Sequence, residues 1–188
     1  MKRCDWAKTP IEQDYHDREW GTVCHDERKL FELLILEGMQ AGLSWLTILK
    51  KRQAFQAAFD NFDYHKIAQY DKNKIEHLLE NPAIIRHRLK IEATVNNAQC
   101  FLKIEDKYDS FDHFIWSFLP EGPLINHWQK IAEVPAKTAL SERVSQALKK
   151  EGFKFVGPTI IYSYMQAIGM INDHLEDCSF KYKKTQEK

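Results

Sequence analysis

The chain has 188 residues, of which 44% are hydrophobic and 12% are aromatic, and its 27 basic residues equal its 27 acidic ones. This length indicates one domain or two small subdomains, with a core that buries about 70% of the unfolded surface. No stretch has the length and apolar character of a membrane span, and the first residues lack a signal-peptide pattern. We therefore predict a cytoplasmic protein without a membrane partner, in which the four cysteines stay reduced.

The balanced charge is unevenly distributed. Segment 84–91 contains Arg86, Arg88 and Lys90 and no acid, and segment 181–188 contains four lysines and one glutamate, so each carries a net charge of +3. Binding to phosphates requires a basic face rather than a basic protein. An ordinary solvated surface is the more common explanation of either run.

Apolar residues recur at helical spacing from one end of the chain to the other, while glycine and proline are few. The spacing predicts helices over 26–38, 44–59, 63–70, 71–80, 87–107, 110–118, 141–151 and 158–169. Four residues have the type and place of helix N-caps: Asp26, Ser44, Asp71 and Ser141. No run alternates long enough to indicate a strand. We predict an all-α fold, with one domain or two helical subdomains in residues 1–180 and a basic tail at 181–188.

The junction between the first two predicted helices is the most informative segment. Residues 30–36 are apolar on nearly every side, which predicts a buried helix, and Glu37 follows them directly. A carboxylate there loses hydration unless a cation or a hydrogen-bond donor meets it. Gly38 and Gly42 are expected to break the helix before Trp45 begins the next one. A buried acid beside an aromatic ring favours a pocket for a flat cationic ligand, and a solvated glutamate in an ordinary turn is the alternative.

Two cysteines and two histidines are candidates for a metal site that ties the ends of the chain together. Cys4 and His16 lie near the N-terminus, and His174 and Cys178 lie four residues apart near the C-terminus. Two thiolates and two imidazoles form a closed tetrahedral Zn²⁺ set of the structural kind. The spacing is far from that of a zinc finger, and buried free thiols remain the alternative.

A glycine-bounded turn follows the predicted helix 141–151. It runs from Gly152 through Phe153 and Lys154 to Gly157, and Pro158 then suits the first position of the next helix. Such a turn exposes backbone N–H groups, and the helix start adds partial positive charge, so the segment is a candidate phosphate cradle. It is not a Walker loop, and an ordinary packing corner between helices is the alternative.

Several motifs together resemble the 3-methyladenine DNA glycosylase I family, a member of the helix-hairpin-helix DNA glycosylase superfamily. The resemblance extends from Arg3-Cys4-Asp5-Trp6 to Cys178. It is carried by Tyr15-His16-Asp17 with Glu19-Trp20-Gly21, by Leu36 through Trp45, by Ile84 through Arg88, by Trp116-Ser117-Phe118, and by Lys149 through Gly157 with Tyr162 through Ala167. Their order and joint presence are specific, although each motif alone is weak.

The resemblance implies a repair enzyme that flips cationic N3-methyladenine out of double-stranded alkylated DNA and releases it as free 3-methyladenine. It implies structural zinc bound by Cys4, His16, His174 and Cys178. It also implies that the hairpin Gly152, Phe153, Lys154 and Gly157 binds DNA, and that a base pocket contains the following residues: Glu37 as the catalytic group, Tyr15, Trp20, Trp45 and Trp6. Met39 stands where relatives often carry glutamine, which leaves the role of Glu37 unaffected.

Other roles follow from the same comparison. Gln40, Gly42 and Leu43 of the junction are expected to contact DNA, with Leu43 as a candidate wedge in the gap left by the flipped nucleotide. Many superfamily members use an aspartate after the hairpin to support the sugar cation. Asp173 lies in that region, but it is also placed to orient His174, so we do not assign it as catalytic.

The absence of a lysine from Pro158-Thr159-Ile160, where the superfamily's Schiff-base lysine would lie, predicts a monofunctional glycosylase without strand cleavage. We expect a monomer. Three alternatives stay open: a non-catalytic zinc-stapled module that binds DNA, a small-molecule binder of cationic purines, and a zinc hydrolase. Four protein ligands would leave no open position on the metal, which argues against the last.

Overall fold

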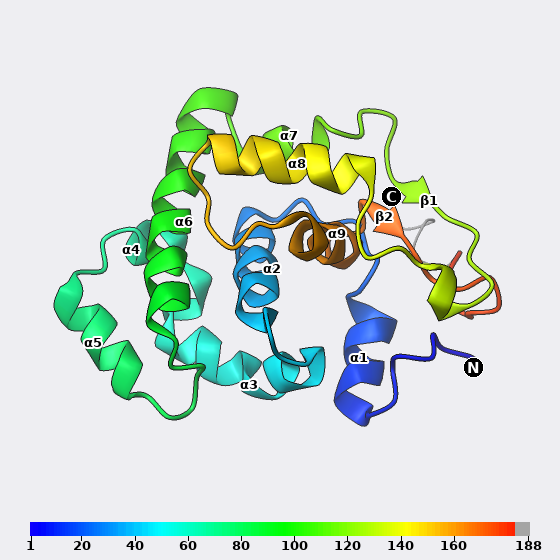
Figure 1. Cartoon of the computed structure of the whole chain (residues 1–188), viewed down its shortest axis with the longest axis horizontal. Helices are drawn as coiled ribbons and strands as arrows, with labels where there is room; N and C mark the ends of the chain where they lie inside the picture. Colours follow the sequence, from blue (N-terminus) through cyan, green and yellow to red (C-terminus); the bar gives the residue numbers. More distant parts are fainter. Residues whose placement is uncertain (183–188) are drawn as a thin grey trace.

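Helix α2 (Glu27–Gln40) runs through the middle of the molecule in this computed structural model, which describes residues 1–182 (Figure 1). Every residue from Leu30 to Met39 is buried. A helix that is apolar on all sides must be surrounded to remove that surface from water. Its neighbours are α3 (Trp45–Ala58), α6 (Arg88–Tyr108), α7 (Phe111–Trp116) and α9 (Pro158–Ala167).

The remaining elements are shorter and lie around this centre. They are α1 (Pro10–Arg18), η1 (Asp60–Phe62), α4 (Tyr64–Ile67), α5 (Lys72–Glu80), β1 (Leu124–Ile125), η2 (Ile131–Glu133), α8 (Ala139–Lys150) and β2 (Ile171–Asn172). The two strands pair in parallel, with Leu124 opposite Ile171. The described residues thus confirm the predicted helical class, and none of their helices combines the length and apolar character needed to cross a membrane.

Each of the eight predicted helices has a counterpart among the described residues, and three of the four N-caps are confirmed. Asp26, Ser44 and Asp71 each accept a hydrogen bond from the backbone N–H three residues on. The prediction for Ser141 is wrong, because α8 begins two residues earlier and Thr138 is its N-cap. Ser141 instead donates its hydroxyl back to the carbonyl of Thr138, at 3.0 Å.

Helix α1, the strand pair and the short helices η1 and η2 were not predicted from the sequence. Helix α1 is polar and lacks a clear apolar face, yet it carries a recognisable start signal. Thr9 and Glu12 form a capping box, and Pro10 occupies the first helical position. The strand pair is two residues long on each side, too short for alternation to show in a sequence.

A partly buried ion-pair network holds α1, α2 and α3 together. The Arg52 guanidinium of α3 contacts the carboxylate of Glu19, at 2.5 Å, and that of Glu32, at 2.9 Å. Lys29 also pairs with Glu19. Glu19 follows α1 directly and Glu32 lies in α2, so this network sets the position of α1 against the central helix.

The described end of the chain is part of the folded structure. Lys181, assigned above to the basic tail, is fully buried, and its ammonium group donates hydrogen bonds to the carbonyls of His174 and Asn126. The predicted start of the tail at residue 181 is therefore too early. The rest of that tail, residues 183–188, lies outside the described residues.

Candidate active site

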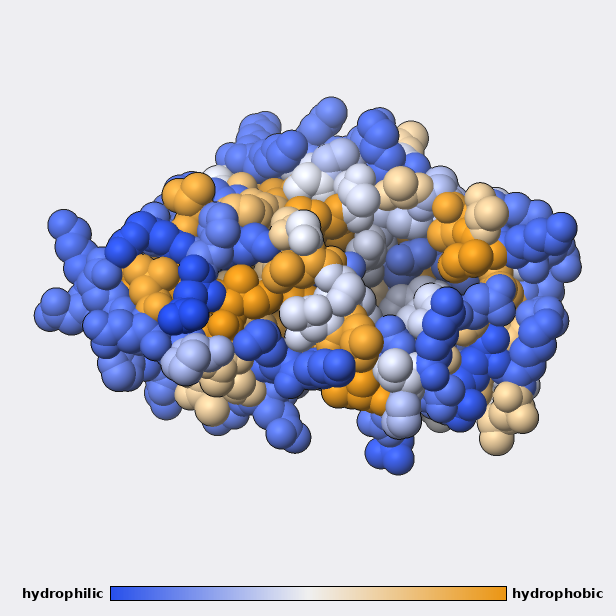
Figure 2. Space-filling view, turned by 60° about the horizontal axis from the view of Figure 1, so that its bottom comes forward, coloured by the Kyte–Doolittle hydropathy of each residue, from blue (hydrophilic) through white to orange (hydrophobic). Residues whose placement is uncertain are grey.

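A pocket of about 410 Å³ lies where the end of α2 and the start of α3 meet α1, α9 and the segment around η2. Figure 2 shows a hollow to the right of centre. The turn between the two views keeps left–right positions, and α1 and the segment around η2 also lie right of centre in Figure 1. All five residues predicted for base binding line this pocket: Trp6, Tyr15, Trp20, Glu37 and Trp45. The fold thus brings together side chains from three separate segments.

Glu37 is a buried acidic group in the wall of the pocket. It lies in the last turn of α2, is 4% exposed, and makes no hydrogen bond or ion pair with the described residues. Burial raises the pKa of its carboxyl from 4.5 to about 8. The acid is therefore largely protonated at neutral pH, and a cation bound beside it would favour the ionised form.

Two hydrogen-bond donors lie beside this acid. The hydroxyl of Tyr15 and the indole N–H of Trp45 are both buried, and neither has a hydrogen-bond partner within residues 1–182. The two rings lie 5.3 Å apart at 54° to one another. Burial, followed by the charge of Glu37, holds the pKa of Tyr15 well above 10, so its oxygen stays protonated. Buried donors without partners are costly, and a bound ligand with acceptor atoms would satisfy them.

Aromatic rings continue the wall from this point. Trp20 is 9% exposed, and its ring meets that of Trp6 edge-on at 5.1 Å. The Trp20 ring also lies 4.5 Å from the imidazole of His174. Trp20 thus separates the pocket from the histidine and cysteine cluster, and the rings offer π-faces that attract a cation.

Asp173 also reaches the pocket, but its carboxylate is fully engaged. One oxygen accepts from Asn126 and Trp128, both at 2.7 Å. The other accepts from Tyr162, at 2.5 Å, and from Gln166, at 2.6 Å. The expectation that Asp173 orients His174 is wrong, because the Nδ1 atom of His174 faces Asn172 instead, at 3.0 Å.

Part of the pocket wall was not predicted from the sequence. The segment after β1 contributes apolar side chains, and α9 contributes polar ones: Ile131, Val134, Pro135 and Ala136, then Thr159, Tyr162, Ser163 and Gln166. Tyr162, Ser163 and Gln166 fall within a motif used above for the family resemblance, which was the only available signal. The apolar ones carry no motif, and only packing brings them to the pocket.

The three residues of the α2–α3 junction that were predicted to contact DNA do not all lie in the same place. Gln40 lines the pocket, whereas Gly42 and Leu43 lie outside it, and the Leu43 side chain is 40% exposed. Gly42 has φ +80°, a left-handed conformation that favours glycine. The expectation that Gly38 breaks α2 is wrong, because it lies inside the helix where Phe155 approaches closely.

The turn between α8 and α9 exposes Gly152 and Lys154 and buries Phe153. Gly152 has φ +94°, Gly157 is the N-cap of α9, and Lys154 is exposed. Phe153, predicted to bind DNA, is only 4% exposed, and its ring lies 6.0 Å from that of Phe111. Only the backbone of Phe153 is therefore left to face a ligand.

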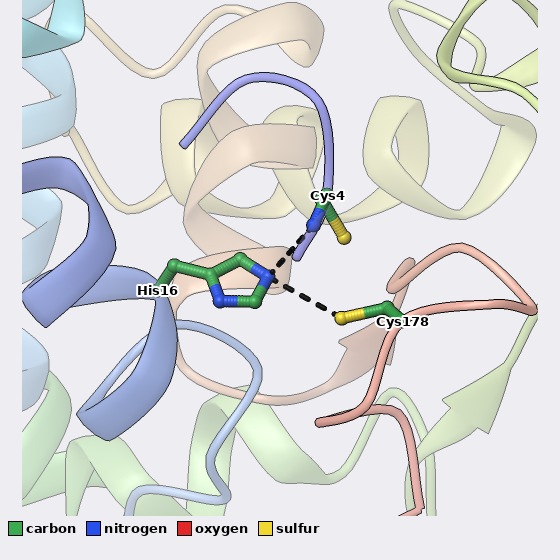
Figure 3. Close-up of side chains that lie close together, drawn as sticks. All are labelled: Cys4, His16 and Cys178. Carbon is green, nitrogen blue, oxygen red and sulfur yellow. Dashed lines mark hydrogen bonds between the residues drawn. The ribbon is translucent and has the colours of Figure 1, made fainter. Parts of the chain in front are cut away.

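Three of the four predicted metal ligands form a buried cluster. The Sγ atoms of Cys4 and Cys178 and a ring nitrogen of His16 lie within 4.8 Å of one another (Figure 3). The Nε2 atom of His16 is 3.5 Å from the Cys178 sulfur, while its Nδ1 atom is 2.9 Å from Asp17. A carboxylate behind a histidine is the arrangement that orients metal-binding imidazoles.

The fourth predicted ligand, His174, lies next to this cluster, but it is not among the residues whose ligand atoms lie within 4.8 Å of one another. Its ring centroid is 4.9 Å from that of His16. The pKa of the Cys178 thiol is lowered, because the Cys4 thiol donates a hydrogen bond to it and because His16 lies nearby. A thiolate is the protonation state that metal binding requires.

Comparison with known proteins identifies the group to which this architecture belongs. The family model for methyladenine glycosylases matches residues 6–182. DNA-3-methyladenine glycosylase 1 of Escherichia coli K12 is 46% identical over 179 residues, which cover 95% of this chain and 96% of that protein. DNA-3-methyladenine glycosylase of Haemophilus influenzae is 47% identical over 180 residues, which cover 95% and 97%.

Solved structures agree with these relatives over nearly the whole length. A crystal structure of 3-methyladenine DNA glycosylase I has a TM-score of 0.92 at 48% identity, covering 95% of this chain and 98% of that one. The enzyme from Staphylococcus aureus, in a structure described as the basis of its 3-methyladenine recognition, has a TM-score of 0.93 at 41% identity, with 96% and 97% covered. The chain therefore belongs to the methyladenine glycosylase family.

Proposed function

We propose that this protein is a DNA-3-methyladenine glycosylase, which excises 3-methyladenine from alkylated DNA in repair. The observation that carries the proposal is the buried carboxyl of Glu37, set among aromatic rings in a pocket that two unpartnered donors also face. Relatives with the same name match nearly the whole chain. Family membership argues against the non-catalytic DNA-binding module and the purine-binding protein.

The chemistry suits a lesion that carries its own positive charge. When the bond between the sugar C1′ and the base N9 breaks, the electron pair goes to N9 and neutralises the ring cation. Water adds to C1′ and loses its proton to solvent, which leaves an abasic sugar and free base. Because the leaving group is already activated, selection of the lesion is the harder task. Ionised Glu37 accepts a hydrogen bond from the cationic base and favours it over neutral adenine, which is discrimination by differential binding.

The decisive experiment is chromatography of the bases released from methylated duplex DNA. Free 3-methyladenine is expected, with 7-methylguanine left in the DNA, and Glu37→Gln is expected to release much less. The control is wild-type protein on unmethylated duplex. If folded protein that still binds methylated duplex releases no base, the assignment is wrong.

The reaction ends at base release. Pro158 begins α9, and among the described residues no lysine lines the pocket. Without an amine near C1′, no Schiff base with the sugar can form, so the DNA strand stays intact. A covalent enzyme–DNA adduct trapped by borohydride would contradict this part of the proposal.

Zinc belongs to the same proposal as a structural ion. Cys4, His16 and Cys178 supply two sulfurs and one imidazole in a buried cluster, and His174 is the candidate for the fourth ligand. This donor set fits Zn²⁺, which would join the N- and C-terminal segments behind Trp20 without taking part in the reaction. Metal analysis of purified protein is expected to give one zinc per chain, lost in Cys178→Ser and retained in Cys24→Ser.

We also propose that the protein acts as a monomer on double-stranded DNA. Light scattering of the protein alone and with a lesion-containing duplex tests this. A molecular mass of one chain is expected in the first case, and one chain per duplex in the second.

A further inference from the structure

Helix α6 contacts both segments that were predicted to meet DNA, and it does so through buried polar side chains. Lys90, in its first turn, is 7% exposed and reaches the end of α2. Asn97, seven residues further on, is 3% exposed and reaches the turn between α8 and α9. Residues seven apart lie on the same face of a helix.

Lys90 closes the C-terminus of α2. Its ammonium group donates to the carbonyl of Met39, at 2.8 Å, and to that of Ala41, at 2.6 Å. The last carbonyls of a helix lack partners within the helix and carry partial negative charge, so a cation is well placed there. Lys90 forms no ion pair with the described residues, which means that these carbonyls supply the polar contacts that offset its burial.

Asn97 holds a single residue of the turn by both of its amide atoms. Its Oδ1 accepts from the backbone N–H of Lys154, at 2.8 Å, and its Nδ2 donates to the Lys154 carbonyl, at 2.9 Å. Its neighbour Asn96 donates to the carbonyl of Gly152, at 2.9 Å. Three hydrogen bonds from α6 thus fix the backbone of the turn and leave the Lys154 side chain exposed.

The two contacts meet at one close-packed point. A Cβ atom placed on Gly38 of α2 would lie 3.4 Å from the Cβ of Phe155 in the turn. Gly38, Lys90, Asn97 and Phe155 all border the same gap, whose volume is about 10 Å³, no more than a water molecule needs. Figure 1 shows the connection between α8 and α9 passing beside α6 and in front of α2. Gly38 directly follows Glu37, so the turn packs against the helix end that carries the acid.

We propose that Lys90 and Asn97 are positioning residues of the glycosylase reaction, which hold the α2–α3 junction and the α8–α9 turn at a fixed spacing on α6. Duplex DNA held by the turn then presents its flipped base at the depth of Glu37. A displacement of about 1 Å between anchoring and reacting groups costs up to about 100-fold in rate. The inference rests on the proposed function and adds which residues align DNA with the pocket.

The test compares duplex DNA with the free base. Asn97→Ala removes both hydrogen bonds to Lys154, and Lys90→Met keeps the apolar stem but removes the cation. For each, we expect kcat/KM for base release from methylated duplex to fall on the order of tenfold. Affinity for free 3-methyladenine, followed by tryptophan fluorescence, is expected to change less than about twofold. The backbone hydrogen bonds of α2 keep Glu37 in place in both variants.

Gln99→Ala is the matched control. Gln99 is also on α6 and also donates its amide to a backbone carbonyl, that of Ala68, at 3.0 Å, but away from both segments. It is expected to leave both measurements unchanged. Thermal unfolding confirms that each variant is folded at the assay temperature.

The outcomes separate this inference from the proposed function. Absence of base release by the wild-type protein tells against the glycosylase assignment itself. An active wild type with undiminished duplex release by Asn97→Ala overturns the positioning role. Equal losses for duplex and free base would show that the variants damage the pocket generally, which also overturns it.

Discussion

Replacing Glu37 by glutamine is expected to raise the free energy of unfolding while lowering the release of 3-methyladenine. Burial raises the pKa of this carboxyl from 4.5 to about 8, so folding favours its protonated form. Below pH 4.5 the acid is protonated in both the folded and the unfolded chain, and its titration costs nothing. As the pH rises from 4.5 to 8, the unfolded chain ionises first, so the free energy of unfolding falls. Above pH 8 both states are ionised, and the loss stays constant.

The size of the effect follows from the pKa difference. Each unit corresponds to about 1.4 kcal/mol, so the wild-type chain loses about 3 kcal/mol by pH 7 and about 5 kcal/mol above pH 8. Glutamine does not titrate and has nearly the same shape. Glu37→Gln should therefore equal the wild type near pH 4 and exceed it increasingly at higher pH. At pH 7, about 3 kcal/mol corresponds to a rise of about 6–12 °C in Tm for a chain of this size.

The assay is urea unfolding of both proteins at a series of pH values from 4 to 9. Glu12→Gln serves as a control of opposite sign. Glu12 lines the same pocket, but although partial burial raises its pKa, hydrogen bonds from Thr9 lower it overall. That variant should be less stable than wild type by a constant amount above about pH 4.5, and the deficit should shrink as the pH falls through the lowered pKa of Glu12. A difference between Glu37→Gln and wild type that stays flat with pH would refute the reasoning, because it would mean that Glu37 is ionised in the folded state.

Three further predictions concern the rest of the molecule. Arg52→Met should lower the free energy of unfolding in urea at pH 7 by about 1–3 kcal/mol, since Glu19 and Glu32 lose the guanidinium and keep only Lys29 as a cationic partner among the described residues; the loss should shrink at acid pH as both carboxyls take up protons, and a loss below 1 kcal/mol would contradict it. Removing zinc with a chelator should lower Tm, and Cys178→Ser should abolish that response; an unchanged Tm in zinc-loaded wild type would argue against a structural ion. Asp173→Asn should cost about 1–3 kcal/mol in the same urea titration, because an amide in place of the carboxylate leaves donors unpartnered, and equal stability would show that solvent replaces those bonds.

Much of the site could be predicted because its signals are local. A helix that is apolar all round must be buried, so an acid at its end loses water wherever the helix packs. This predicted the environment of Glu37 before any neighbour was known. Side-chain caps such as Asp26 and Ser44 act within one turn and are visible in the same way. The grouping of Cys4, His16 and Cys178 was predicted from donor chemistry and the family resemblance, and zinc binding there stays a prediction.

The remaining features depend on contacts between segments distant in sequence, and the structure alone decided them. Gly38 reads as a helix breaker, yet it lies within α2 because Phe155 needs the space. Phe153 reads as part of an exposed turn, yet it packs into the core. The partners of Asp173 come from two separate segments. Periodicity and capping describe a residue's own helix, whereas a pocket is set by how several helices pack, and that packing leaves no regular trace in sequence.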